Sequence, residues 1–408
     1  MTPLKTALVL SLAGAGLVAC GGGTEERDTA GADRDFQTHL IEQLIDAQPG
    51  AVIEIPAGVF AFDRSLSLTV DGVTIRGQGM DETILTFQDQ VQGAEGLLVT
   101  ASDFTIENLA IEDTVGDGLK INEGENIVIR GVRVEWTNGP DTENGAYGLY
   151  PVQTTNVLIE DSVAIGAADA GIYVGQSRNV VVRNNRAERN VAGIEIENTI
   201  GADVYGNTAT ENTGGILVFN MPNLPQPGRQ TRVYDNDVFA NNTGNFGHEG
   251  TPVASIPAGS GIVINSNDEV EIFNNRIADN RTANIIVSSL HSTGYADYSV
   301  QPDFDPYPEG IHIHGNTFSG GGNNPDGIDL QGLRVMIDGP MGRLPDVLWD
   351  GFSDPEKPAG IARICVDNGD IDVLNADGPN GYDNPAITTA EHQCTLDPLP
   401  AISLDLAH

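Results

Sequence analysis

Basic residues are scarce in this sequence of 408 residues. It has 20 lysines and arginines against 58 acidic residues, which gives a formal net charge of −38. A surface this acidic repels a phosphate backbone, so nucleic acid is excluded as an expected partner. The excess of acids fits a cationic partner, bound calcium, or solubility alone. Calcium is the only cofactor that the composition suggests.

Long apolar runs are missing, with one exception at the N-terminus. Residues 6–19 read TALVLSLAGAGLVA, which is short for a membrane-spanning helix and ends in small residues, as a signal peptide does. The string Leu17-Val18-Ala19-Cys20 matches the bacterial lipoprotein signal, so residues 1–19 are expected to be cleaved off and Cys20 to carry the lipid; an ordinary signal peptide is the alternative. Residues 20–33 are polar and predict a flexible tether. We therefore expect a protein anchored in the bacterial cell envelope, at the outer membrane or the periplasmic face.

Cysteine is also rare, with three residues in the whole sequence. Apart from Cys20, only Cys365 and Cys394 are present, and neither belongs to a CxxC or CxxCH motif. A redox or haem role for these two residues is therefore not indicated. An even pair in an exported protein predicts a disulfide, which would stabilise the C-terminal part of the chain.

Glycine, in contrast, is abundant and regularly spaced. A glycine-aliphatic phrase recurs, and Gly171, Gly193 and Gly215 are 22 residues apart, close to one coil of a right-handed parallel β-helix. The phrases are DGLKI (117–121), AGIYV (170–174), AGIEI (192–196), GGILV (214–218) and SGIVI (260–264). The sequence therefore predicts an all-β solenoid in which equivalent residues of successive coils lie above one another.

A second short strand follows each phrase, and then a pair of asparagines spaced by five residues. The pairs are Asn185/Asn190, Asn207/Asn212, Asn236/Asn241 and Asn275/Asn280. We expect the asparagines at sharp turns, because Asn tolerates the left-handed conformation and its amide can bond to the Asn one coil away. Alternating apolar residues in the strands predict three parallel sheets with aliphatic side chains stacked inside.

The N-terminal part carries a resemblance to a known superfamily. Residues 34–48 have the apolar stripe of an amphipathic helix, and AVIEIPAGVFAF follows at 51–62. This string resembles the N-terminal cap and first coils of pectin-lyase-like β-helices, in which a helix covers the open end and protects the core and strand edges. The resemblance implies a β-helix domain at 34–330, with an irregular segment at 331–408 packed on it.

This superfamily hosts lyases, hydrolases, epimerases, binding proteins and adhesins, so the resemblance says little about activity. Residues 305–327 (DPYPEGIHIHGNTFSGGGNNPDG) and the cysteine-bearing tail are similar to exported lipoproteins with tandem β-helix repeats whose function is unassigned. That resemblance implies a second exported protein, a c-type cytochrome, as a partner.

Insertions between repeats indicate where function is expected. They fall at 136–146, 220–231, 242–259 and 289–309, each beside the glycine-aliphatic strand, so we expect them to wall one cleft. Outward positions of neighbouring coils on this face are expected to carry a base, two aromatic rings and acids. Tyr150, Tyr173 and Asn122 are the candidate substrate-binding residues, and Lys120, Glu195 and Glu197 are the candidate catalytic residues.

The alternating string IHIH places His312 and His314 on one strand face. Two histidines with a nearby carboxylate, such as Asp303, Asp305 or Glu309, suggest a metal site. We expect the isoleucines to point inward and both histidines to be exposed, which disfavours the site. The string DPYPE at 305–309 is similar to a motif of mannuronan epimerases, but Tyr307 stands where that motif has histidine, which argues against an epimerase.

The sequence thus favours a lipid-anchored β-helix protein that binds or modifies an acidic polysaccharide along one face. Whether it is an enzyme stays open; if it is, a polysaccharide lyase, hydrolase or epimerase is expected. A non-catalytic partner of an exported cytochrome and a structural surface protein are the alternatives.

Overall fold

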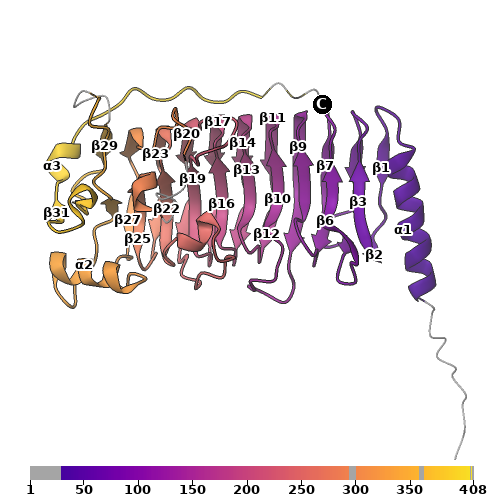
Figure 1. Ribbon diagram of the computed structural model, residues 1–408. Helices are drawn as coiled ribbons and strands as arrows, with labels where there is room; N and C mark the ends of the chain where they lie inside the picture. Colours follow the sequence, from indigo (N-terminus) through magenta and orange to yellow (C-terminus); the bar gives the residue numbers. More distant parts are fainter. Residues whose placement is uncertain (1–28, 294–299, 358–362, 405, 407–408) are drawn as a thin grey trace, which may run out of the picture.

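The computed structural model describes residues 29–293, 300–357, 363–404 and 406. The expected signal peptide, the lipidated Cys20 and most of the tether lie outside these residues. Within them, short parallel strands are stacked into an elongated solenoid, with the N-terminal helix at one end (Figure 1). No helix in the described part is long and apolar enough to cross a membrane.

The strands form three columns, one for each side of the coil. Two columns belong to one 19-stranded sheet, because β7 (Thr105–Glu112) and β9 (Glu125–Glu135) run from one column into the next. The first column also contains β1 (Val52–Glu54), β4 (Thr74–Arg76), β11 (Thr155–Glu160), β14 (Arg178–Arg183), β17 (Ile200–Tyr205), β20 (Arg229–Tyr234), β23 (Asp268–Phe273), β26 (Glu309–His314) and β29 (Ile364–Asp367). The second column also contains β2 (Gly58–Ala61), β5 (Thr83–Thr86), β12 (Val163–Ile165), β15 (Arg186–Glu188), β18 (Thr208–Thr210), β21 (Asp237–Phe239), β24 (Arg276–Ala278) and β27 (Thr317–Ser319).

The third column is a separate 12-stranded sheet, called sheet B below, and it holds the glycine-aliphatic phrases. All of its strands run parallel except β31, which pairs antiparallel with β30. They are β3 (Arg64–Leu68), β6 (Gln92–Val99), β8 (Leu119–Asn122), β10 (Tyr147–Val152), β13 (Ala170–Gly175), β16 (Ala192–Glu197), β19 (Gly214–Phe219), β22 (Ser260–Asn265), β25 (Ala283–Ser288), β28 (Val347–Trp349), β30 (Val373–Asn375) and β31 (Ala386–Ile387).

The core is a ladder of aliphatic side chains between the columns. Ile172, Ile194, Ile216 and Ile262 stand in register on β13, β16, β19 and β22, and all four are completely buried. The predicted inward stacking is therefore confirmed. Burying each such side chain contributes about 1.5–3 kcal/mol, which a solenoid repeats coil by coil.

The repeated glycine is required by close packing rather than by unusual backbone angles. A Cβ added at Gly193 would lie 2.5 Å from the carbonyl oxygen of Gly215 one coil away, and one at Gly171 would lie 2.6 Å from the amide of Asn190. No side chain fits such distances without a backbone shift. The glycine therefore marks the corner where sheet B meets the asparagine turns.

The asparagines form two buried ladders along the solenoid. In one, Asn185 donates to Asn207, Asn207 to Asn236 and Asn236 to Asn275; in the other, Asn190 donates to Asn212 and Asn212 to Asn241. The bonds between coils are as expected. The expectation that the ladder asparagines themselves adopt the left-handed backbone conformation is wrong. The positive φ angle belongs to the residue before each ladder asparagine, namely Asn184, Arg189, Gly206, Glu211, Asp235, Ala240, Asn274 and Asp279.

Helix α1 (Thr29–Ile45) covers the open N-terminal end of the solenoid (Figure 1). Leu40 and Leu44 are buried against the first coils, and the Phe36 ring stacks on Phe60 with centroids 3.8 Å apart. The helix thereby shields the core end that an uncapped solenoid would expose.

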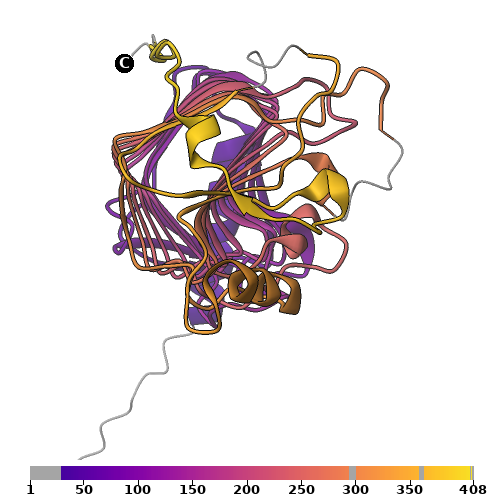
Figure 2. The ribbon, with the colours of Figure 1, turned by 90° about the vertical axis from the view of Figure 1, so that its left-hand side faces the viewer.

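The boundary expected at residue 330 does not match the structure. After helix α2 (Ile328–Asp338), β28 continues sheet B beside β25, and β29 continues the first column beside β26. The segment 331–408 therefore adds coil strands and is only partly irregular. In the part of the chain that the structure describes, three 3-10 turns, at Pro252–Ser255, Leu290–Ser292 and Gly378–Asn380, and the short helix α3 (Thr389–His392) complete the elements. Viewed along the axis, α2 lies on the outside of the coils (Figure 2).

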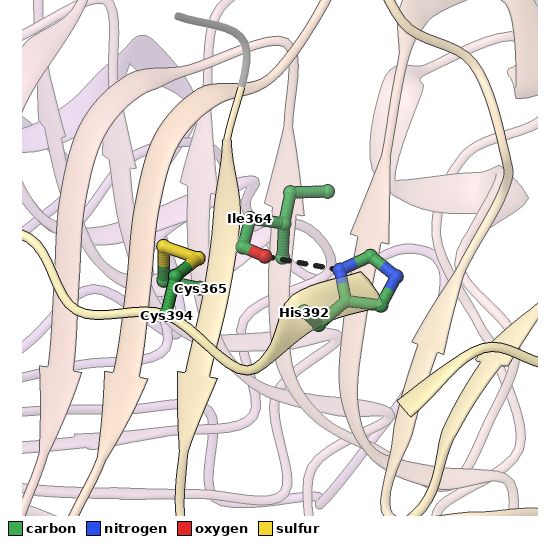
Figure 3. Close-up of a disulfide and its surroundings, with 4 residues drawn as sticks. All are labelled: Ile364, Cys365, His392 and Cys394. Carbon is green, nitrogen blue, oxygen red and sulfur yellow. Dashed lines mark hydrogen bonds between the residues drawn. A yellow bond between two sulfur atoms is a disulfide. The ribbon is translucent and has the colours of Figure 1, made fainter. Parts of the chain in front are cut away.

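Cys365 of β29 forms a disulfide with Cys394, with Cα atoms 4.9 Å apart (Figure 3). Beside it, the backbone carbonyl of Ile364 lies 3.0 Å from Nδ1 of His392 in α3. From Cys394 the chain runs back along the outside of the first column toward the N-terminal coils (Figure 1). This C-terminal tail, residues 395–404 and 406, packs Ile402, Leu404 and Leu406 around the outward side chains Val128, Leu158 and Val181.

Candidate functional site

The outer face of sheet B brings the predicted residues together on adjacent coils. Lys120 of β8 stands opposite Tyr150 of β10, and Tyr173 of β13 stands opposite Glu195 of β16. The rings of Tyr150 and Tyr173 meet edge to face at 5.0 Å. The order of the residues is therefore the one that the repeat predicts.

The Lys120 end of this row is the accessible end. Lys120 Nζ lies 3.3 Å from Asp117 Oδ2 and 4.7 Å from the centroid of the Tyr150 ring. Asn122 ends β8 beside Val152, half-buried, and no side-chain bond in the described residues ties it to the tyrosines. Asn122 therefore has little support as a substrate-binding residue.

Three carboxyl groups gather at the other end of the row. Asp169 and Glu195 are 6% and 3% exposed, and no described cation lies within ion-pair distance of either residue or of Glu197. The Tyr173 hydroxyl donates to Glu197 Oε2 at 2.5 Å, while Glu195 Oε2 has no described partner. Burying an unpaired carboxylate is costly, so this cluster is a candidate functional site.

Burial raises the pKa of all three carboxyl groups. Desolvation, followed by the charge of Glu197, raises the pKa of Asp169 to about 8, and desolvation raises that of Glu197 to about 7. Desolvation and the neighbouring Asp169 raise the pKa of Glu195 well above its ordinary value. Each group therefore keeps its proton near neutral pH more readily than a surface carboxyl does, which suits proton transfer.

Replacing Glu197 by Gln is expected to stabilise the protein above neutral pH. Because the folded pKa of Glu197 is above its unfolded value, the folded state binds more protons between about pH 4.5 and 7, and stability falls as pH rises through this window. The amide removes this loss, so we expect a gain of roughly 2–3 kcal/mol in the free energy of unfolding at pH 8 and little change at pH 4. Urea unfolding at both pH values measures it, and an equal effect at both would contradict the assignment.

Asp169 and Tyr147 belong to the cluster but were not predicted from the sequence. Tyr147 packs its ring against Tyr150 and Tyr173 at 4.4 and 4.6 Å, and it opposes the rise in the pKa of Asp169. The signal available in the sequence was the position of Tyr147 in the repeat. Tyr147 is aligned with Ala170, and Ala170 with Ala192, where the repeat otherwise has small residues. A large residue at such a position indicates an added role.

The predicted cleft requires the insertions to leave the carboxyl cluster open, and they do not. Phe246, Val253 and Ile256 of the insertion 242–259 join an apolar cluster on the outer face of sheet B, with Tyr173 and Leu217. Leu217 and Val263, which are outward positions of the ladder, are therefore buried. The insertion 220–231 is fixed on the same side, where Gln226 donates to the carbonyls of Ser177 and Asn198.

A cavity of about 810 Å³ opens on sheet B next to the cluster. Its floor includes Phe219, which is aligned with Glu197, and Asn265 and Ser288 on the next coils. Residues of three insertions and of α2 contribute to its walls, whereas none from 136–146 does. The remaining lining residues are mostly apolar and include Met221, Ile256, Val263, Ile286, Leu330, Leu333 and Leu348.

The second candidate site lies on the first column. Ile311 and Ile313 point inward as expected, but His312 is 7% exposed, so the expectation that both histidines are exposed is wrong. The carboxylate beside them is Glu271 rather than Asp303, Asp305 or Glu309; Asp305 and Glu309 bind Lys357 instead. Burial lowers the pKa of His312, which keeps its ring neutral.

Comparisons with known proteins agree with this architecture. A family model described as "right handed beta helix region" matches residues 57–238. The structure resembles the A-module of a mannuronan C-5 epimerase from Azotobacter vinelandii, with a TM-score of 0.50 and 17% identity over 82% of this chain and 88% of that one. The chain has a right-handed parallel β-helix fold.

A second β-helix structure, the DFA-IIIase of Arthrobacter chlorophenolicus, is similar with a TM-score of 0.43 and 12% identity, over 80% of this chain and 90% of that one. No curated protein sequence matches the chain. At these identities the similarity describes the fold, and the site of this β-helix has to be judged from its own residues.

Proposed function

We propose that this β-helix protein is a carbohydrate-modifying enzyme whose acid/base groups are Glu195 and Glu197 on sheet B. The observation that carries the proposal is a set of three carboxyl groups without a paired cation in the described residues: Asp169 and Glu195 are buried, and Glu197 is half-buried. A merely structural face would gain stability from apolar residues at these positions, as it does at Leu217 and Val263 one and two coils further on. The names of the similar structures, an epimerase and a DFA-IIIase, support a carbohydrate substrate.

The positions of the two glutamates suit paired acid/base chemistry. They are two residues apart on one face of β16, so their Cα atoms are about 7 Å apart. Glu195, with the more strongly raised pKa, is the proton donor, and Glu197, held by Tyr173, is the group that ionises near neutral pH. Glycosidases use such a pair of carboxyls across the scissile bond.

The charge of the site favours an uncharged sugar over the uronate expected from the sequence. Asp117, Asp169, Glu195 and Glu197 line the row. Among the described residues, the one cation near them is Lys120, which is already paired with Asp117. A uronate would be repelled by these carboxyls wherever they ionise. The tyrosine rings and the apolar cavity beside Glu197 suit the faces of neutral sugar rings.

Access to Glu195 requires the insertion 242–259 to move. In the structure its Phe246 and Ile256 belong to the apolar cluster around Tyr173, and Glu195 is 3% exposed. Loops of this kind commonly close over a substrate and exclude water. We therefore include opening of residues 242–259 in the proposal.

The test uses the chain with Cys20→Ser, so that no lipid is attached, and a panel of neutral and uronate polysaccharides. New reducing ends detect hydrolysis, ultraviolet absorbance detects an unsaturated product of a lyase, and proton NMR detects epimerisation. We expect turnover of a neutral glycan. Turnover of uronates alone would refute the substrate class, and no turnover and no binding of any glycan would refute the enzyme. The cytochrome partner, the structural role and the lipid anchor stay predictions.

A further inference from the structure

The geometry points to a binding site for a divalent transition-metal ion at Glu271, His312 and His314, on the outer face of the first column. One ligand atom from each of the three side chains lies within 4.8 Å of the others. In a four-coordinate site the ligand atoms are about 3.4 Å apart, given metal–ligand distances near 2.1 Å. Small side-chain rotations therefore suffice to bring all three onto one ion.

The strands set this arrangement. His312 and His314 alternate along β26, so both rings lie outside the coil, with centroids 4.3 Å apart. Glu271 of β23 is the register partner of His312, and its Oε1 lies 3.0 Å from His314 Nε2. The His314 ring is also stacked on Phe273 at 5.2 Å, which fixes its plane.

His312 supplies an independent observation. It is 7% exposed, yet neither of its ring nitrogens has a hydrogen-bond partner among the described residues. Buried polar groups usually have hydrogen-bond partners, and an imidazole left with two unpaired nitrogens is destabilising. A bound cation would satisfy one of these nitrogens and explain why the position is not apolar.

Neighbouring residues enclose the site, but they engage only part of its ligand atoms. Glu271 Oε2 accepts the backbone N–H of Leu399 in the C-terminal tail at 3.1 Å. Arg232 approaches Glu271 with Nε at 3.8 Å, but its guanidinium already binds Asp203 at 3.0 Å. On the other side, Cys365, the register partner of His312, is held in the disulfide and offers no thiolate.

The donor set defines the kind of ion. Two imidazoles and one carboxylate suit Zn²⁺ and its neighbours Co²⁺, Ni²⁺ and Cu²⁺, whereas Ca²⁺ and Mg²⁺ require oxygen ligands. Asp367 is the register partner of His314 on the next coil, but its carboxylate does not belong to the group of ligand atoms that lie within 4.8 Å of one another. The calcium suggested by the composition is therefore not the ion that this site selects.

The site also connects the tail to the solenoid. Glu271 holds the Leu399 amide with one carboxylate oxygen and faces His314 with the other. An ion that fixes the Glu271 carboxylate therefore also fixes its bond to the tail. We expect metal binding to slow hydrogen exchange at the Leu399 amide and to protect residues 395–404 from proteolysis.

The experiment titrates Zn²⁺ and Co²⁺ into the chain with Cys20→Ser, made without a histidine tag and treated with a chelator. We expect one ion per chain, visible Co²⁺ bands of a four- or five-coordinate site, and slower exchange at Leu399. His314→Ala removes a half-exposed ligand without disturbing the core and should weaken Zn²⁺ binding about a hundredfold or more.

His39→Ala is the matched control, because His39 is an exposed imidazole on α1 and its loss should not change the affinity. Equal Zn²⁺ affinity of His314→Ala and the parent chain would overturn the site, as would parent protein that gives no Co²⁺ bands. Both readouts are independent of turnover at Glu195, which lies on sheet B, so the two proposals fail separately.

Discussion

Glu195→Gln is expected to lower turnover by about a hundredfold to ten-thousandfold while the β-helix stays folded. The amide keeps the shape of the side chain but has no proton to donate at the reacting bond, and general acid/base groups contribute factors of this size. Because Glu195 Oε2 has no partner in the described residues and its pKa is raised by burial, the neutral amide costs the fold little. The measurement is kcat and KM on the glycan identified by the panel, with the thermal midpoint of unfolding as the check on folding.

Glu143→Gln is the control for this variant. Glu143 is an exposed glutamate on the insertion 136–146, so it tests the same Glu-to-Gln substitution without touching the cluster. We expect unchanged turnover. If Glu195→Gln retained the parent's kcat, the assignment of the proton donor would be wrong, whatever the substrate.

Asn212→Leu is expected to destabilise the solenoid by roughly 3–6 kcal/mol. Asn212 is completely buried; its Oδ1 accepts from the backbone N–H and the side-chain amide of Asn190, and its Nδ2 donates to Ala187 and Asn241. Leucine has similar volume but satisfies none of these groups, and each buried group left unpaired costs about 1–3 kcal/mol. Urea unfolding followed by circular dichroism measures the change.

Asn138→Leu provides the comparison, because Asn138 is exposed and no side-chain hydrogen bond is found for it in the described structure. Its effect should stay within about 0.5 kcal/mol. A loss below about 1 kcal/mol for Asn212→Leu would show that the ladder is not important for stability and that the aliphatic stack alone holds the coils together.

The outer row of sheet B shows how much of the candidate site could be predicted from the sequence. Lys120, Tyr150, Tyr173 and Glu195 were predicted in their correct order, because strand alternation and a fixed repeat place equivalent residues on one face. The same argument missed Asp169 and Tyr147, which stand at the corner where the repeat glycine interrupts simple alternation. It also predicted an open cleft where Phe246 and Ile256 cover the face.

The site at Glu271, His312 and His314 shows what the sequence could not predict. The pairing of His312 with His314 is local and was visible in IHIH, but Glu271 lies 41 residues earlier, and only the coil register places it beside them. The burial of His312 was not predicted either. It follows from the fold on both sides of the strand, with β29 and its disulfide to one side and the tail residue Leu399 bound to the other.

By itself the sequence determined the architecture of this protein: the coil period, the inward aliphatics, the asparagine ladders and the capping helix. These features repeat, and their physical causes act within one coil or between a residue and its copy in the next. Only the tertiary structure decided which carboxyl groups are buried, which insertion covers them and what surrounds His312. Those properties depend on contacts between segments of unrelated sequence, and burial, which raises the pKa of Glu195 and leaves His312 without a partner, is set by such contacts alone.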